Sequence, residues 1–265
     1  MKEEFRLASL QLIFFLDIYS LPIDRYISDF ISIFDEMKPL LLPLPDDVAP
    51  EVPRLIISKP NTFEFKVTRD RLDINYFFTY SSNKLELEEN ISTVKDQPDN
   101  ETNYKKDFRD KVTLLFNFIN KQELSIKNLG YISSYISHNI QNRNERIKFI
   151  FNDSNLPITF DDDSEISLNF LTKSKTNWGD KEVLINKSHL VNTGIVSATD
   201  NKRLMLLSTD INTFPTDDLK LTLEKEFLTF LDNTDKESID FVKAIQNSST
   251  TTETADKVSA SDLTV

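Results

Sequence analysis

The sequence predicts an α+β protein made of two related halves, each in the order strand, helix, meander of strands, helix. Apolar stripes with a period of 3.6 residues alternate along the chain with segments in which every second residue is apolar. The 20 phenylalanines provide much of a core, although hydrophobic residues make up only 39% of the chain. Because the order of elements occurs twice, we expect one curved, mostly antiparallel sheet with helices packed on one face.

The first half, residues 1–124, opens with an apolar run over residues 7–18 that favours a buried strand. A helix follows, because apolar residues recur every three or four positions and Pro22 suits the first helical turn. The apolar positions of this helix are Ile23, Tyr26, Ile27, Phe30, Ile31, Phe34 and Met37. Prolines in the next stretch predict an extended connection.

The connection leads into an antiparallel meander. Apolar and polar residues alternate strictly over 63–67 and 72–76, and residues 55–57 make the strand before them. Such alternation places one face of each strand against a core and the other in solvent. The polar stretch 81–104 is expected to be a loop, and a second helix begins near Lys105.

The second half, residues 125–247, repeats this order more faintly. Strands are predicted over 129–140, 166–170, 183–185, 190–196 and 203–211. Helices are predicted over 143–151 and 219–231, and residues 239–245 extend or follow the last of these. Residues 248–265 lack aromatic residues and periodicity, which predicts a disordered tail.

A compact ion cluster, Arg69-Asp70-Arg71, lies between two alternating segments. An antiparallel pair must reverse direction there, and Asp favours such turns because its side chain bonds the local backbone. We therefore favour a turn over a working site. Arg71-Leu72 is echoed by Arg203-Leu204 ahead of the last strand of the second half, which predicts a shared position for the two arginines.

Composition excludes several kinds of function. With only 3 glycines, none of them clustered, the chain lacks the glycine-rich loops that cradle phosphates. The absence of cysteine excludes disulfides, iron–sulfur clusters, Cys-based zinc sites and a thiol nucleophile. A formal net charge of -12 opposes binding to nucleic acid and favours a protein partner. No cofactor is indicated.

Carboxylate and histidine patterns predict no metal site. The run Asp161 to Asp163 with Glu165 lacks the spacing and the central glycine of a calcium loop, so we expect a solvated turn. His138 and His189 have no His, Asp or Glu three or four residues away that would complete a motif. Trp178, beside Gly179, suits either a cap over the core or an anchor for a partner.

The N-terminal segment does not have the pattern of a signal peptide, because Glu3 and Glu4 replace its basic region and Gln11 and Asp17 interrupt the apolar run. No stretch of the chain approaches eighteen apolar residues, so no membrane span is predicted. A cytoplasmic location is expected.

Three segments resemble a sporadically distributed family of uncharacterised bacterial proteins of similar length. They are residues 53–57, residues 63–76 with Arg71-Leu72, and residues 203–211 before the final helices. The resemblance extends to about residue 247. The family has no established activity, so no site residues carry over. The repeated unit is also similar in outline to the saddle fold of the TATA-binding protein, an analogy of fold alone.

The sequence thus predicts a non-enzymatic binding protein that engages a protein partner or itself, with Arg69, Arg71, Arg203 and Trp178 as candidate binding residues. Two alternatives stay open. One is an enzyme with a cleft between the halves, for which Asp70, Arg71 and Asp210 are the nearest candidates. The other is a nucleic-acid binder with a basic strip on the sheet, formed by Lys66, Arg69, Arg71 and Arg203.

Overall fold

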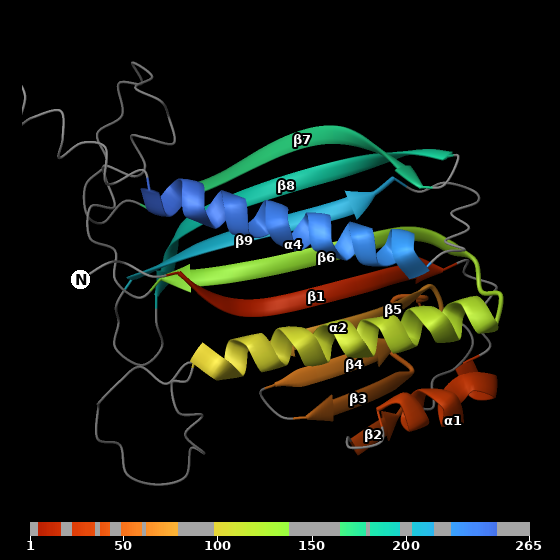
Figure 1. The fold of residues 1–265 in the computed structure, drawn as a ribbon. Coiled ribbons are helices and arrows are strands. Elements are labelled where there is room, and N and C mark those ends of the chain that lie inside the picture. The colour runs from red at the N-terminus through yellow and green to blue at the C-terminus, as the bar shows by residue number, and fades with distance from the viewer. Residues whose placement is uncertain are drawn as a thin grey trace, which may run out of the picture.

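A computed structural model describes residues 5–16, 23–34, 38–42, 49–59, 62–78, 98–137, 165–178, 181–196, 203–214 and 224–247. These residues form nine strands and three helices (Figure 1). The strands are β1 (Arg6–Leu16), β2 (Lys38–Leu41), β3 (Leu55–Lys59), β4 (Phe63–Val67), β5 (Arg71–Phe77), β6 (Ile126–Ser137), β7 (Ser167–Trp178), β8 (Lys181–Val196) and β9 (Arg203–Thr213). The helices are α1 (Ile23–Ile33), α2 (Pro98–Lys121) and α4 (Glu224–Asn247).

All nine strands belong to one open antiparallel sheet in the order β2-β3-β4-β5-β1-β6-β9-β8-β7. The pair β1–β6 lies near the middle, where Leu12 is opposite Tyr131. β2 and β7 are the two outer strands. The α+β class and the antiparallel sheet predicted from the sequence are confirmed.

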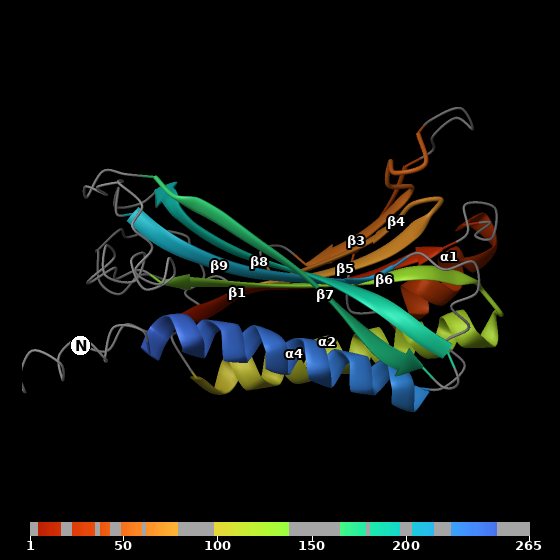
Figure 2. The same ribbon diagram turned by 90° about the horizontal axis from the view of Figure 1, so that it is seen from above.

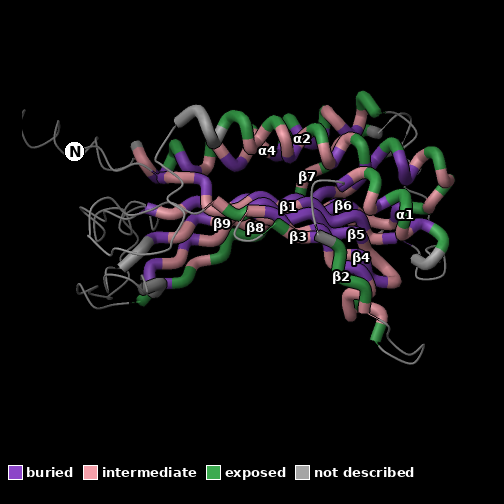
Figure 3. The backbone as a smooth tube through the Cα atoms, turned by 90° about the horizontal axis from the view of Figure 1, so that it is seen from below, coloured by how far each residue is buried: buried purple, intermediate pink, exposed green. Residues whose placement is uncertain are grey.

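The helices cover one face of the sheet, and the sheet curves away from them toward both ends (Figure 2). Alternation explains this arrangement. In β4 the side chains of Phe63, Phe65 and Val67 are buried under the helices, while Glu64 and Lys66 on the opposite, concave face are half-buried. The same division runs through the other central strands, so buried residues concentrate between sheet and helices (Figure 3).

Phenylalanine rings form the core between these layers. Phe227 of α4 stacks on Phe116 of α2, with ring centroids 4.3 Å apart, and lies 5.7 Å from Phe14 of β1. Phe30 of α1 packs against Phe65 at 5.4 Å. Fully burying each such ring contributes about 1.5–3 kcal/mol, and these contacts join elements from both halves of the sequence.

Some boundaries differ from the sequence prediction. Residues 38–41 form the edge strand β2 in a region predicted only as extended. α2 begins at Pro98, inside the predicted loop. Of the two alternatives for residues 239–245, the structure has the first: they extend the preceding helix within α4. The predicted helix over 143–151 and the predicted tail over 248–265 lie outside the described residues. None of the described helices is long and apolar enough to cross a membrane.

Candidate functional site

The charged segment that begins with Arg69 forms a tight turn between β4 and β5. Thr68, almost fully buried, organises it: the N–H of Arg71 donates to Thr68 Oγ1 at 3.1 Å, and Thr68 Oγ1 donates to Asp70 Oδ1 at 2.6 Å. The backbone carbonyl of Asp70 accepts a hydrogen bond from the N–H of Leu16. Asp70 therefore has a structural role at this turn, in agreement with the interpretation of the cluster as a reversal of the chain.

The four candidate binding residues are distributed over the sheet. Arg69 is in the turn, and its N–H donates to the carbonyl of Pro50 at 3.1 Å. Arg71 begins β5 on the concave face, and its Nε is buried without a hydrogen bond from the described residues. Arg203 begins β9 and Trp178 ends β7; their side chains lie outside the described part of the structure.

The strand order separates the residues of the enzyme site considered as an alternative. β1 and β6 separate β5 from β9, which puts about 14 Å between those strands at about 4.8 Å per step. Asp70 and Arg71 therefore do not converge with Asp210. On the proposed basic strip, Lys66 forms an ion pair with Glu64, Nζ to Oε1 at 2.5 Å, so part of its charge is neutralised.

The concave face does carry a repeated polar pair that sequence reasoning missed. Asp73 Oδ1 accepts hydrogen bonds from Asn75 at 3.0 Å and from Gln11 at 2.9 Å. On β9, Asp210 accepts a hydrogen bond from Asn212 in the same way. Burial raises the pKa of both aspartates. The identical triplets Asp-Ile-Asn at 73–75 and 210–212 were the available signal.

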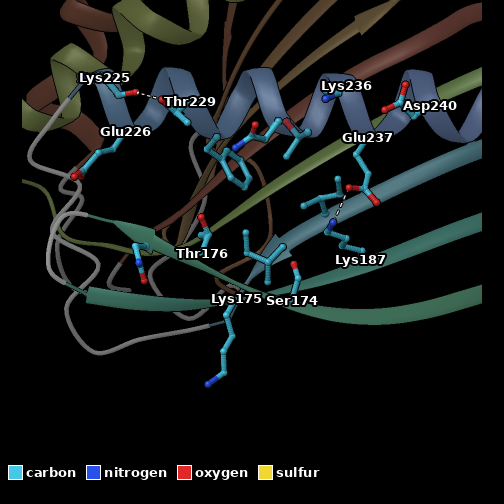
Figure 4. Close-up of a pocket in the computed structure, with 16 residues that line it drawn as sticks. Ser174, Lys175, Thr176, Lys187, Lys225, Glu226, Thr229, Lys236, Glu237 and Asp240 are labelled. Carbon is cyan, nitrogen blue, oxygen red and sulfur yellow. Dashed lines mark hydrogen bonds and ion pairs between the residues drawn. The ribbon is translucent and has the colours of Figure 1, made fainter.

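The opposite side of the sheet carries a groove lined by both polar and apolar residues. It lies between α4 and the strands β7, β8 and β9, and its volume is about 780 Å³ (Figure 4). The strands contribute Ser174, Lys175, Thr176, Asn177, Ile185, Lys187 and Ile211. Helix α4 contributes Lys225, Glu226, Thr229, Phe230, Asn233, Thr234, Lys236, Glu237 and Asp240.

The groove forms because α4 turns its apolar stripe toward the middle of the sheet. Phe227, Phe230 and Leu231 are buried there, and the flank of the helix that faces β7 is polar. Ile185, Ile211 and Phe230 line the bottom of the groove and are nearly inaccessible. Hydroxyl, amide and charged groups thus share the accessible surface of the groove with apolar atoms.

An ion pair and a histidine connect α4 to β8 at one end of the groove. Lys187 Nζ lies 2.6 Å from Glu237 Oε2 (Figure 4), and His189 Nε2 lies 3.6 Å from Glu237 Oε1. His189 Nδ1 is 3.3 Å from Thr209 Oγ1. Burial lowers the pKa of His189 and opposes the effect of Glu237, which raises it. His189 thus contacts both Glu237 of α4 and Thr209 of β9.

This network does not have the arrangement of a nucleophilic site, because Thr209 is only 1% exposed and cannot meet a substrate. Within the described residues, no group of three or more His, Asp or Glu side chains is placed to hold a metal ion. Sequence reasoning gave His189 no partner, since it considered only neighbours along the chain. Its partners come from α4 and β9.

The upper margin of the groove carries charges of both signs. Lys225, Glu226, Lys236 and Asp240 lie along α4 and form no ion pair with another described residue. Lys175, on β7, points away from the helix in Figure 4 and pairs with Glu182 at 2.7 Å. A ligand in the groove would therefore meet two cations and two anions that form no ion pair within the described part of the chain.

No protein-family model matches the chain, and neither the curated proteins nor the solved structures give a significant match. The resemblance to uncharacterised bacterial proteins therefore stays a prediction.

Proposed function

We propose that this protein is a non-enzymatic binding protein and that the groove beneath α4 holds a segment of a protein partner. The observation that carries the proposal is the groove itself: it exposes polar and apolar groups together, has a buried apolar base, and is bordered by charges of both signs that form no ion pair within the described residues. Acidic and basic side chains that lack partners are suited to recognising a polypeptide with complementary charges.

The length of the groove favours a polypeptide over a compact small molecule. Helix α4 rises about 22 Å between Lys225 and Asp240 at about 1.5 Å per residue. That length matches about six or seven residues of extended chain at about 3.3 Å each. A segment of this size would reach Glu226 at one end and Lys236 near the other. Its own charges would pair with these groups in sequence, which fixes direction and register.

Nucleic acid is the less favourable ligand. The net charge of -12 repels phosphates, and the groove presents Glu226 and Asp240 beside its lysines. An enzyme with a site between the halves is also less favourable, because β1 and β6 lie between β5, which follows Asp70, and β9, which carries Asp210. A cytoplasmic location stays a prediction.

The experiment fills the groove with a bulky side chain. Asn233 lines the groove and is exposed, and Asn117 is an equally exposed asparagine on α2 outside it. The partner is recovered by affinity purification of the tagged wild-type protein at native expression level, and its Kd is then measured for both variants. We expect Asn233→Trp to weaken binding by at least about tenfold, or about 1.4 kcal/mol, and Asn117→Trp to leave it unchanged.

Equal Kd values for the two variants would remove the groove from the interaction. Recovery of nucleic acid that depends on Lys66 and Arg71 would replace the proposal by its alternative. Repeated recovery of the protein alone would contradict a stable partner.

We also propose that the two halves arose by duplication. The strand order supports this: β3-β4-β5-β1 on one side of the centre corresponds to β7-β8-β9-β6 on the other. The final strand of each meander lies next to the opening strand of the same half, and α2 and α4 follow β5 and β9.

The pairing register of the strands supports an alignment of the two halves that matches Asp73 with Asp210. If Asp73 matches Asp210, their neighbours on the central strands, Ile13 and Ile132, also match. Buried Ile74 then falls on buried Ile211.

If Arg71 instead matched Arg203, as the sequence suggested, the buried face of β5 would correspond to the half-buried face of β9. This alignment would put buried Ile74 on half-buried Leu206, and a shift of one residue exchanges the two faces of a strand. An experimental structure tests the duplication directly. Superposed halves should align Asp73 with Asp210, and alignment of Arg71 with Arg203 would contradict the proposed correspondence.

A further inference from the structure

The outer strand β7 presents an accessible edge. It is the last strand of the sheet formed by the described residues, and its 12 residues pair with β8 alone, without a bulge. Leu171 is 75% exposed, more than any other large apolar side chain described, and Phe170 beside it is 40% exposed. Unpaired backbone groups next to exposed apolar side chains form a template for another strand.

The usual protections of an edge strand are weak in β7. Edges are normally kept apart by short length, proline, bulges or outward lysines. β2, at the other side of the sheet, has 4 residues and includes Pro39. β7 has no proline, and both of its lysines are engaged by their own chain. Lys173 Nζ lies 5.3 Å from the centre of the Phe214 ring, and Lys175 pairs with Glu182.

We propose that β7 pairs antiparallel with β7 of a second copy of this chain, about a two-fold axis at Leu171. A two-fold axis perpendicular to the sheet keeps the helix-covered face of both copies on the same side. Residues paired across it must therefore point to the same face, which requires the axis to lie midway between the two copies of one residue. With the axis at Leu171, this side chain lies opposite Leu171 of the second copy and becomes less exposed to solvent. Lys173 then faces Asn169, and Phe170 faces Thr172.

Charge supports this register. An axis at Lys173 would place two lysines directly opposite each other, which destabilises strand pairing. An axis at Leu171 opposes no two charged residues of β7, because Lys175 faces Ser167. The assembly also stops at two copies. Each β7 has one free edge, which the dimer occupies, and the short outer strand β2 with Pro39 does not suit the addition of another strand.

This pairing goes beyond the proposed function and does not depend on it. It joins two sheets into one and leaves the helices of both copies on the same face. Because β7 forms one wall of the groove beneath α4, the two grooves would lie side by side across the joined strands. A partner with two suitable segments would then bind with increased avidity.

The absence of cysteine from the chain allows a sharp test by disulfide trapping. In an antiparallel pair, opposite Cα atoms are about 4.5–5.5 Å apart, within the range a disulfide spans. In the full-length protein, Leu171→Cys should give a reducible covalent dimer under mild oxidation. Leu114→Cys, on the exposed side of α2, should stay monomeric. Thr172→Cys should form far less disulfide-linked dimer than Leu171→Cys. Preferential trapping through Thr172 would overturn the register.

Sedimentation provides a readout without oxidation. The wild-type protein should show a concentration-dependent monomer–dimer equilibrium in the micromolar range. Leu171→Lys places two ammonium groups opposite each other and should raise the dimer Kd by about tenfold or more. Leu114→Lys adds the same charge elsewhere and should not change it. A wild-type protein that is monomeric throughout, or a Leu171→Lys dimer of unchanged Kd, would overturn the proposal.

Discussion

Removing the ring of Phe227 tests how the two halves of the chain hold together. The ring is fully buried, stacks on Phe116 at 4.3 Å with an interplanar angle of 4°, and also contacts Phe14. Both partners come from the first half, whereas Phe227 belongs to the second. Phe227→Ala removes this packing and leaves a cavity, so we expect a loss of about 3–5 kcal/mol of unfolding free energy.

For a chain of this size, that loss corresponds to a fall in Tm of roughly 6–15 °C. Urea unfolding followed by circular dichroism gives the free energy, and Leu114→Ala on the exposed side of α2 is the control, expected within about 0.5 kcal/mol of wild type. Because the pairing of β1 with β6 still joins both halves in one sheet, the variant should unfold in one transition. A loss below about 1 kcal/mol, or two separate transitions, would refute this account of the core.

Three further predictions concern titration and backbone conformation. Burial raises the pKa of Asp73 in the folded protein. The contribution of this carboxyl group to stability is therefore fully present below its ordinary pKa of 3.8 and is lost as pH rises through the raised pKa. Asp73→Asn should raise Tm at neutral pH, and this gain should disappear in acid. The NMR titration midpoint of His189 should lie below 6.5 and fall further in Glu237→Gln; a midpoint above 6.5 would contradict its burial. Glu123, after α2, has a φ of 53°, so Glu123→Gly should stabilise the protein by about 1 kcal/mol in urea unfolding.

The elements with a clear period were predictable from the sequence. The meander over 63–76 alternates strictly because its strands are buried on one face only, and α1 carries a single apolar stripe. β7 could not be identified in full. It is an outer strand with exposed residues on both faces, including Phe170 and Leu171, so no alternation of apolar and polar residues marks it.

The candidate groove was beyond sequence reasoning for a different reason. Lys187 and Glu237 meet through the packing of α4 on β8, and no local spacing relates residues so far apart in the chain. His189 was assigned no partner on the same local grounds. The Asp-Ile-Asn repeat, by contrast, is visible in the sequence and is a stronger match between the halves than Arg71-Leu72 and Arg203-Leu204.

Site-specific photocrosslinking tests the central claim, that a partner protein lies in the groove beneath α4. A photoreactive amino acid replaces Asn233 in the groove or, as the matched control, Asn117 on α2, and the protein is irradiated in its native cells. The account predicts one discrete adduct with a protein partner from position 233 and none from 117. Adducts from position 117 alone, or no adduct from 233 while the partner is still recovered, would contradict it.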